Sequence, residues 1–246
     1  MKKSRILIIV LITGILTSCS PDSTGDVSRV TNFPIITLNG SDLILLNEGG
    51  SYDEPGAVAV AGGAELPVVV NSGEGTYRGF EGVDSSKSDQ YIVTYSAKNE
   101  DGFDGNALRT VWVANTGDLT TNIEGLYTSS IQRAPSFTPS PQYNDKQYVL
   151  IWKTGTDSYE ISHAVGGYYD LGRGIGPGYA ARGAVITAND ITSNDFSISQ
   201  AQFPIWGNTV DITEFTVDAS NKTITFTGDG NFGNGTFKVQ LKQVQF

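Results

Sequence analysis

The chain has very few of the residues that make cross-links and metal sites. Its 246 residues include one cysteine, one histidine and one methionine. A single cysteine excludes an internal disulfide, and the usual zinc sites need clusters of cysteine and histidine that this sequence lacks. The fold therefore has to be stabilised by its hydrophobic core. A chain of this length suffices for two modest domains.

Basic residues are also scarce. The sequence contains 16 Lys and Arg against 26 Asp and Glu, which gives a net charge of −10. Loss of residues 1–18, with Lys2, Lys3 and Arg5, would leave 13 basic against 26 acidic side chains. Because binding to a polyanion needs clustered basic residues, nucleic acid is excluded as a partner and anionic substrates are disfavoured.

Helical periodicity is missing as well. After residue 18, no segment keeps apolar residues at i, i+3, i+4 and i+7 over three turns, whereas the sequence contains 29 glycines and many short β-branched runs. This pattern predicts an all-β protein.

The N-terminus has the features of an export signal. Basic residues precede an apolar run at residues 6–15, which is too short to span a bilayer. Leu16-Thr17-Ser18-Cys19 then resembles the Leu-x-x-Cys box of bacterial lipoproteins. The resemblance implies a signal peptide at residues 1–18 and a mature chain that starts at a diacylated Cys19. The alternative is an ordinary cleaved signal in which Cys19 is incidental.

Residues 19–32 are polar and aperiodic, which predicts a flexible tether. Asp22 and Asp26 lie where some Bacteroidetes-type lipoproteins carry an acidic surface-export signal. We therefore expect a lipid-anchored protein of the outer membrane on the cell surface, with the periplasmic face left open. The membrane would be contacted through the lipid anchor only.

Residues 33–114 are expected to form a β-sandwich. Strand candidates alternate with turn clusters at residues 35–38, 43–46, 57–60, 66–71, 91–97 and 108–114. The motifs Tyr52-Asp53-Glu54-Pro55-Gly56-Ala57 and Tyr91-x-Val93-Thr94-Tyr95 resemble Ig-like domains of bacterial surface proteins related to the pesticidal-crystal-protein type. In this family an aspartate usually stands where Glu54 is found. The resemblance implies a spacer or platform domain without catalysis.

Residues 115–119 read as a linker, and residues 119–246 are expected to form a C-terminal β domain. Its strand candidates are residues 125–133, 147–153, 159–163, 183–188, 195–198, 210–218, 223–227 and 235–244. The last strand alternates between apolar and polar residues, as a half-buried antiparallel strand does. An antiparallel barrel or sandwich fits best, since closure of the sheet removes exposed edges.

The densest unusual segment spans residues 166–183 and contains many glycines. It lacks the spacing of a phosphate loop or a dinucleotide fingerprint. Its tyrosines and charged groups favour stacking on sugar rings and hydrogen bonding to sugar hydroxyls. The carbohydrate-binding candidates in this segment are Tyr168, Tyr169, Asp170, Arg173, Tyr179 and Arg182. The alternative is that these tyrosines pack the mouth of the barrel while the glycines only permit tight turns.

Trp206 is the strongest single candidate for stacking, because Pro204 and Gly207 place it in a loop or at a strand edge. Its alternative is a structural plug over one end of the barrel. Trp152 shares a face with apolar neighbours, as core residues do. Trp112 is expected to face outward, against the second domain.

Little in the sequence indicates catalysis. His163 is the sole histidine, and no Gly-x-Ser-x-Gly elbow accompanies it. Paired carboxylates for glycoside hydrolysis remain an alternative, drawn from Glu160, Asp170, Asp211 and Glu214. Calcium loops at Asp101, Asp104, Asp229 and Asn231 lack the ladder of a helix-loop-helix site, and turn chemistry explains these residues more simply. We expect no enzymatic activity, no metal and no cofactor.

The C-terminal part also resembles the second domain of Bacteroidetes-type lipoproteins from glycan-utilisation systems, on residues 160–169 with Arg173 and Tyr179-Ala180-Ala181. The resemblance implies that the protein holds or senses glycans at the cell surface. We therefore predict non-catalytic binding of a polysaccharide or oligosaccharide. The competing hypothesis is a structural or protein-interaction subunit that docks onto an outer-membrane transporter or another lipoprotein.

Overall fold

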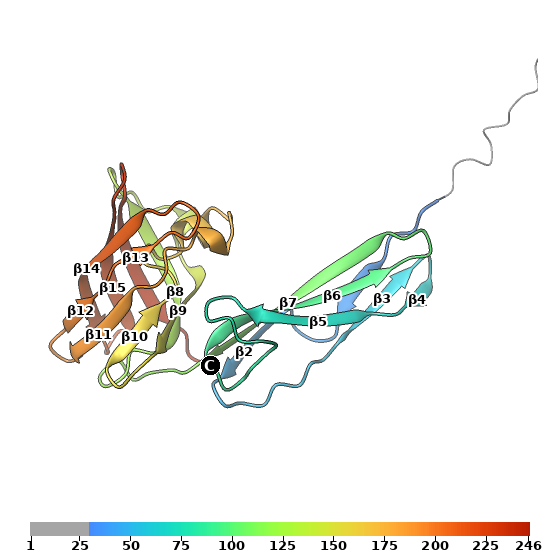
Figure 1. The fold of residues 1–246 in the computed structure, drawn as a ribbon, viewed down its shortest axis with the longest axis horizontal. Coiled ribbons are helices and arrows are strands. Elements are labelled where there is room, and N and C mark those ends of the chain that lie inside the picture. The colour runs from blue at the N-terminus through green and yellow to red at the C-terminus, as the bar shows by residue number, and fades with distance from the viewer. Residues whose placement is uncertain (1–29) are drawn as a thin grey trace, which may run out of the picture.

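The computed structural model describes residues 30–246. The predicted signal peptide, the lipidation site Cys19 and the tether up to residue 29 lie outside this range. The described chain is almost entirely β, as predicted, and forms two units that meet at one end (Figure 1). Within these residues no helix has the length and hydropathy needed to cross a membrane.

The N-terminal unit is a sandwich of two sheets, which we call the N-terminal sandwich. One sheet has the order β1 (Ile35–Leu38), β3 (Ala57–Ala61) and β4 (Ala64–Leu66), all antiparallel. The other has the order β2 (Leu43–Asn47), β7 (Asp104–Ala114), β6 (Asp89–Lys98) and β5 (Val69–Gly75). Here β2 pairs with β7 in parallel, and the other pairs are antiparallel. The predicted sandwich is confirmed.

The core of the N-terminal sandwich follows from the alternation along β6. Tyr91, Val93 and Tyr95 are fully buried, and the residues between them are partly exposed. Successive side chains of a strand point to opposite faces, so each odd-numbered residue reaches the space between the sheets. The predicted half-buried strand is therefore confirmed.

A buried arginine holds this sandwich together. The Arg109 side chain is fully buried, and its guanidinium donates to the Glu54 carboxylate, the Tyr95 hydroxyl and the Asn39 carbonyl. Burial disfavours the Glu54 anion, but hydrogen bonds from Tyr52, Tyr95 and the Gly56 amide, with the charge of Arg109, outweigh this effect and lower the pKa of Glu54. The Glu54 motif thus has a structural role.

The C-terminal unit is one nine-stranded antiparallel sheet, which we call the C-terminal sheet. Its order is β12-β11-β10-β9-β8-β16-β15-β14-β13. The bounds are β8 (Gly125–Arg133), β9 (Lys146–Lys153), β10 (Ser158–Ile161), β11 (Val185–Asp190), β12 (Asp195–Ile198), β13 (Ala201–Gln202), β14 (Thr209–Asp218), β15 (Thr223–Gly230) and β16 (Thr236–Gln243).

The C-terminal sheet curls until its two ends approach each other (Figure 1). The Phe196 ring of β12 lies 4.9 Å from the Phe215 ring of β14, measured between centroids, and the Val217 amide donates to Asn194 Oδ1 at 2.6 Å. One face of β16 is buried through Phe237, Val239 and Leu241. The outer face remains polar. The predicted barrel-like antiparallel architecture is confirmed as a curled sheet.

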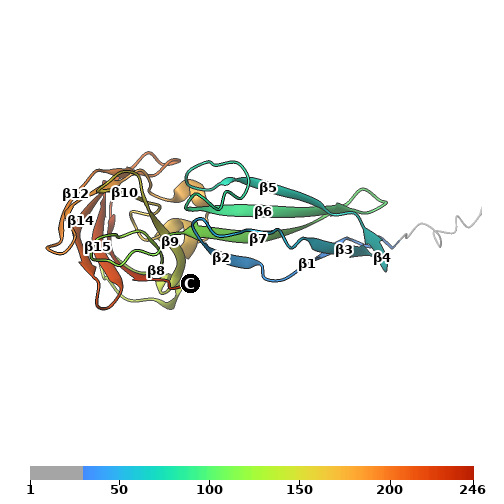
Figure 2. The same ribbon diagram turned by 90° about the horizontal axis from the view of Figure 1, so that it is seen from below.

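Aromatic side chains join the two units. The ring of Tyr77, from the β5–β6 connection, stacks on Trp112 of β7 and Trp152 of β9, with centroid distances of 6.0 and 6.5 Å. The ring also meets the His163 imidazole at 5.5 Å, edge on. Both tryptophans are buried, at 2% and 5% exposure. Trp112 therefore faces the second unit, as expected, and Figure 2 shows the junction from below.

The chain between the units is ordered by its own contacts. Asp118 accepts the amides of Thr120, Thr121 and Asn122 at 2.7–3.1 Å, and Leu119 is buried in the core of the C-terminal sheet. These hydrogen bonds to its backbone neighbours lower the pKa of Asp118. The segment predicted as a linker is thus packed against the second unit.

Candidate functional site

The glycine-rich segment at residues 166–183 folds over one end of the C-terminal sheet. It contains a π-helical turn, η3 (Tyr168–Gly172), and a 3-10 turn, η4 (Pro177–Tyr179), rather than one open loop. Gly166 has φ +65°, and a Cβ there would lie 2.6 Å from Ser129 Oγ. Only glycine allows this close approach of backbone to sheet. Both views place the segment on the side that faces the junction (Figures 1 and 2).

The structure brings three of the predicted aromatic residues together. Trp206 lies in the turn between β13 and β14, with its ring 4.8 Å from Tyr169 and 4.9 Å from Tyr179 between centroids. Phe203 supports it from below at 5.4 Å. Trp206 is nevertheless 44% exposed. An aromatic ring that is held by its neighbours and still open to solvent can serve as a stacking platform.

Tyr168 and Tyr169 form the base of this cluster. They are only 7% and 6% exposed, and Tyr143 stacks on Tyr168 at 4.2 Å. The guanidinium of Arg133 lies 5.3 Å from the Tyr168 ring and 5.5 Å from the Tyr169 ring. Burial raises the pKa of Tyr169, so its hydroxyl stays protonated. These two tyrosines can position Trp206, but they offer little surface to a ligand.

Asp170 is also directed inward. Its Oδ2 lies 2.9 Å from His163 Nε2, and His163 Nδ1 lies 2.7 Å from Ser162 Oγ. Ser162 and His163 are fully buried, and Ser162 Oγ accepts the Leu150 amide at 2.9 Å. A nucleophilic serine must reach its substrate. This Ser-His-Asp arrangement is buried next to the Tyr77 ring, and its hydrogen bonds tie η3 to β9.

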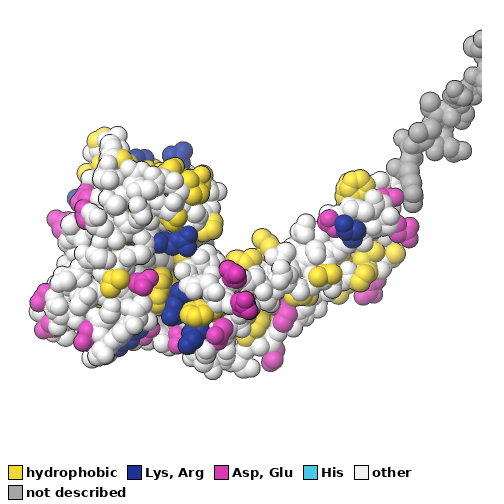
Figure 3. Space-filling model, viewed as in Figure 1, with side chains coloured by type: hydrophobic (Ala, Val, Ile, Leu, Met, Phe, Trp, Pro, Cys, Tyr) yellow, Lys and Arg dark blue, Asp and Glu magenta, His cyan; other side chains and the backbone are white. Residues whose placement is uncertain are grey.

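The two candidate arginines have different surroundings. Arg182 donates to the carbonyls of Thr76 and Pro177, both at 3.1 Å, and so connects the C-terminal sheet to the N-terminal sandwich. Arg173 is exposed at the end of η3. Figure 3 shows Lys and Arg side chains gathered along the side of the C-terminal unit that faces the junction. Of the two, Arg173 is the better placed to meet a ligand.

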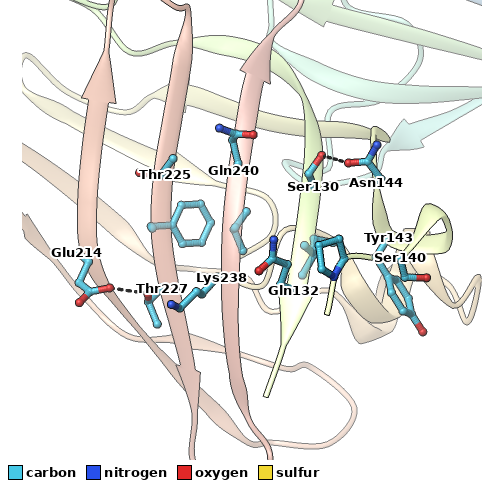
Figure 4. A pocket seen from close by; sticks show the side chains of 14 residues that line it. Ser130, Gln132, Ser140, Tyr143, Asn144, Glu214, Thr225, Thr227, Lys238 and Gln240 are labelled. Atoms are coloured by element: carbon cyan, nitrogen blue, oxygen red, sulfur yellow. Dashed lines mark hydrogen bonds between the residues drawn. The ribbon is translucent and has the colours of Figure 1, made fainter. Parts of the chain in front are cut away.

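A pocket on the outer face of the C-terminal sheet was not predicted from the sequence. It has a volume of about 370 Å³ and opens over β8, β16 and β15 (Figure 4). Its labelled lining residues are Ser130, Gln132, Ser140, Tyr143, Asn144, Glu214, Thr225, Thr227, Lys238 and Gln240. The only feature of the sequence that could have indicated this pocket is the run of polar residues at alternate, outward-facing positions of these strands.

No cluster in residues 30–246 offers three or more His, Cys, Asp or Glu side chains to a metal ion. Two of the calcium candidates, Asp104 and Asp229, lie in strands β7 and β15 rather than in turns. Asp104 forms an exposed ion pair with Lys98 at 3.3 Å across β6 and β7.

Comparison with known proteins agrees with this architecture. A family model described as a bacterial surface protein Ig-like domain matches residues 36–113, and a model of a C-terminal domain matches residues 116–243, more than half of the chain. The crystal structure of the lipoprotein BT2262 from Bacteroides thetaiotaomicron is similar, with 27% identity and a TM-score of 0.65 over 86% of this chain and 100% of that chain. No curated protein matches.

These matches confirm the Ig-like N-terminal domain and the resemblance to Bacteroidetes-type lipoproteins. None of the matching descriptions names an enzymatic activity.

Proposed function

Because this chain belongs to the BT2262-like family of surface lipoproteins, we propose that it is anchored in the outer membrane by a lipid on Cys19 and binds glycans without cleaving them. It would act within a polysaccharide-utilisation system on the cell surface. The Ig-like domain serves as the spacer. Residue 30 lies at the far end of this domain from the C-terminal sheet, so the binding domain extends away from the anchor (Figure 1).

The exposed ring of Trp206 carries this proposal. One face of a pyranose is lined with C–H groups, which pack well on an aromatic ring, while the hydroxyls around the edge need polar partners. Tyr179 extends the platform, and Arg173, which is exposed at the end of η3, offers a guanidinium that can bond hydroxyls. Tyr169 supports the Trp206 ring directly, Tyr168 packs against Tyr169, and Asp170 anchors η3 through His163. A single platform binds weakly, and many copies on one surface compensate by avidity.

The test is affinity electrophoresis of residues 20–246 in native gels. The gels contain neutral polysaccharides (soluble starch, yeast mannan, xylan, laminarin) or anionic ones (polygalacturonate, chondroitin sulfate). At least one neutral polysaccharide should retard the protein, and Trp206→Ala should abolish the retardation. Phe103→Ala is the matched control, since Phe103 is a 47% exposed aromatic residue of the N-terminal sandwich. Release of oligosaccharides from the retarding polysaccharide would contradict the non-catalytic proposal.

A second candidate function is docking onto an outer-membrane transporter or another lipoprotein. It is favoured by the apolar side chains around the platform, since Ile175 and Ile205 are 41% and 60% exposed. Exposed apolar surface of this kind often marks protein contacts. If no polysaccharide retards the chain, a membrane protein that co-purifies with wild type but not with Ile175→Ser/Ile205→Ser would support docking.

A further inference from the structure

We propose that the pocket over β8, β15 and β16 is a second sugar subsite, which binds a neutral residue of the same glycan that stacks on Trp206. The inference rests on the proposed function and adds a second contact to it. Its basis is the chemistry of the lining, the charge balance, the backbone at Glu214 and the position of the pocket relative to the platform.

The lining matches the hydrogen-bonding needs of a sugar. Gln132, Asn144 and Gln240 each present an amide, which both donates and accepts, and Ser130 and Thr225 add hydroxyls that do the same. Sugar hydroxyls also act as donor and acceptor at once. The ring of Tyr143 forms one wall and can cover an apolar sugar face. A volume of about 370 Å³ is within the range of small-ligand sites.

The charges of the pocket favour a neutral ligand. Of its lining residues only Lys238 and Glu214 are charged, so the positive and negative charges balance. Glu214 Oε2 accepts the Thr227 hydroxyl at 2.8 Å, which fixes the carboxylate at the rim of the pocket (Figure 4). A uronic acid or sulfated sugar would meet this carboxylate. The acidic balance of the whole chain disfavours anionic glycans in the same way.

The backbone at Glu214 is unusual. Its φ is +53°, in the left-handed region that favours glycine, at a bulge where the pairing of β14 with β15 shifts between Thr213 and Thr216. Bulges re-aim side chains, and residues held in sparsely populated regions gather at functional sites. Glycine would fit this backbone with less strain. A glutamate here places its carboxylate on Thr227 at the pocket.

The pocket and the platform lie close enough to share one oligosaccharide. Tyr143, on the pocket wall, stacks on Tyr168 at 4.2 Å; Tyr168 meets Tyr169 at 5.0 Å, and Tyr169 meets Trp206 at 4.8 Å. A chain of three ring contacts thus connects Tyr143 in the pocket with Trp206 in the platform. A hydrogen bond from Gln142 Nε2 to the Gly172 carbonyl, at 3.2 Å, joins the pocket loop to η3 next to Arg173.

The experiment uses the double variant Gln132→Ala/Gln240→Ala, which removes two amides from the pocket. The matched control is Thr128→Ala/Lys242→Ala, a cross-strand pair on the same outer face of β8 and β16 that does not line the pocket. Each protein is run in gels with graded concentrations of the neutral polysaccharides named above. Circular dichroism and melting temperature verify that each variant is folded.

We expect the pocket variant to bind the retarding polysaccharide about 5- to 50-fold more weakly, which corresponds to two lost hydrogen bonds, and the control variant to bind as wild type does. Wild-type affinity of the pocket variant, with loss of binding in Trp206→Ala, would overturn the subsite and leave the proposed function intact. Loss in the pocket variant alone would support the pocket and remove Trp206 from the site. Failure of wild type to bind any neutral probe would overturn both. Retardation only by polygalacturonate or chondroitin sulfate would overturn the neutral-ligand inference.

Discussion

Replacement of Tyr77 by alanine is expected to uncouple the two domains. The Tyr77 ring fills the junction between Trp112 and Trp152 and covers the His163 imidazole. Burial raises the pKa of its hydroxyl, so the side chain is neutral throughout the physiological range. The loss on substitution is therefore one of packing and ring contacts.

The size of the effect follows from these contacts. Truncation of a fully buried aromatic residue to alanine typically costs about 3–5 kcal/mol, and each aromatic pair contributes roughly 0.5–1.5 kcal/mol beyond its buried area. Because Tyr77 keeps part of its surface exposed, we expect a loss of about 2–3 kcal/mol in the free energy that couples the domains. Tyr77→Phe keeps the ring and should remain close to wild type.

Urea unfolding followed by tryptophan fluorescence and by circular dichroism provides the assay. Trp112 and Trp152 report on the junction directly because both are buried there. In Tyr77→Ala the fluorescence transition should move to lower urea and separate from the main circular dichroism transition. Coincident transitions at the wild-type midpoint would refute the role assigned to Tyr77.

Two further predictions concern the stability of each domain. Glu54→Gln should destabilise the N-terminal sandwich by roughly 2–3 kcal/mol at pH 7. This loss is smaller than the about 3–5 kcal/mol typical of breaking a fully buried ion pair, because the Glu54 side chain is partly exposed. Since the folded pKa of Glu54 is lowered, its stabilisation is present above the unfolded value of about 4.3 and is lost as pH falls through the folded pKa. Urea midpoints between pH 7 and pH 3 should therefore fall less for Glu54→Gln than for wild type, and equal slopes would contradict the Arg109–Glu54 assignment. Gly228→Ala would place a Cβ 2.4 Å from the Ala164 carbonyl oxygen and should cost about 1–3 kcal/mol in thermal unfolding, whereas Gly233→Ala, with open space around it, should have little effect; equal melting temperatures would argue against this close approach.

The sequence predicted the strands best where one face is buried and the other is wet. The strand at residues 125–133 has the predicted bounds, and β16 shows the predicted alternation. The short strands β4 and β13 were not predicted. At two or three residues their pairing depends on the neighbouring strand and leaves no periodic pattern in the sequence.

Trp152 illustrates what the pattern of one strand can and cannot indicate. The sequence predicted that Trp152 shares a face with apolar neighbours, and Trp152 and its neighbour Leu150 are both buried. The cluster that buries them also contains Trp112 and Ala114 of the other domain, whereas Val149 and Ile151 fill the core of the C-terminal sheet. Both faces of β9 are therefore covered. Periodicity identifies a face, but what covers it is decided by tertiary contacts.

The candidate site was predicted in part. Pro204 and Gly207 predicted that Trp206 lies in a loop or at a strand edge, and it is exposed in the turn between β13 and β14. Whether Tyr168 and Asp170 point outward could not be predicted, because the π-helical turn that directs them inward depends on contacts with Tyr143 and His163. The pocket was missed because its residues come from four strands and a loop that only the folded sheet brings together.

The central claim, that Trp206 is where the protein holds a glycan, is tested most directly by ¹⁵N NMR of the three tryptophan indoles. Trp112 and Trp152 are buried at the junction, and Trp206 is 44% exposed. The indole signal that disappears in Trp206→Phe should be the one that shifts when the retarding neutral polysaccharide is added, while the other two stay in place. An unshifted Trp206 signal at a polysaccharide concentration that retards the protein would contradict the claim.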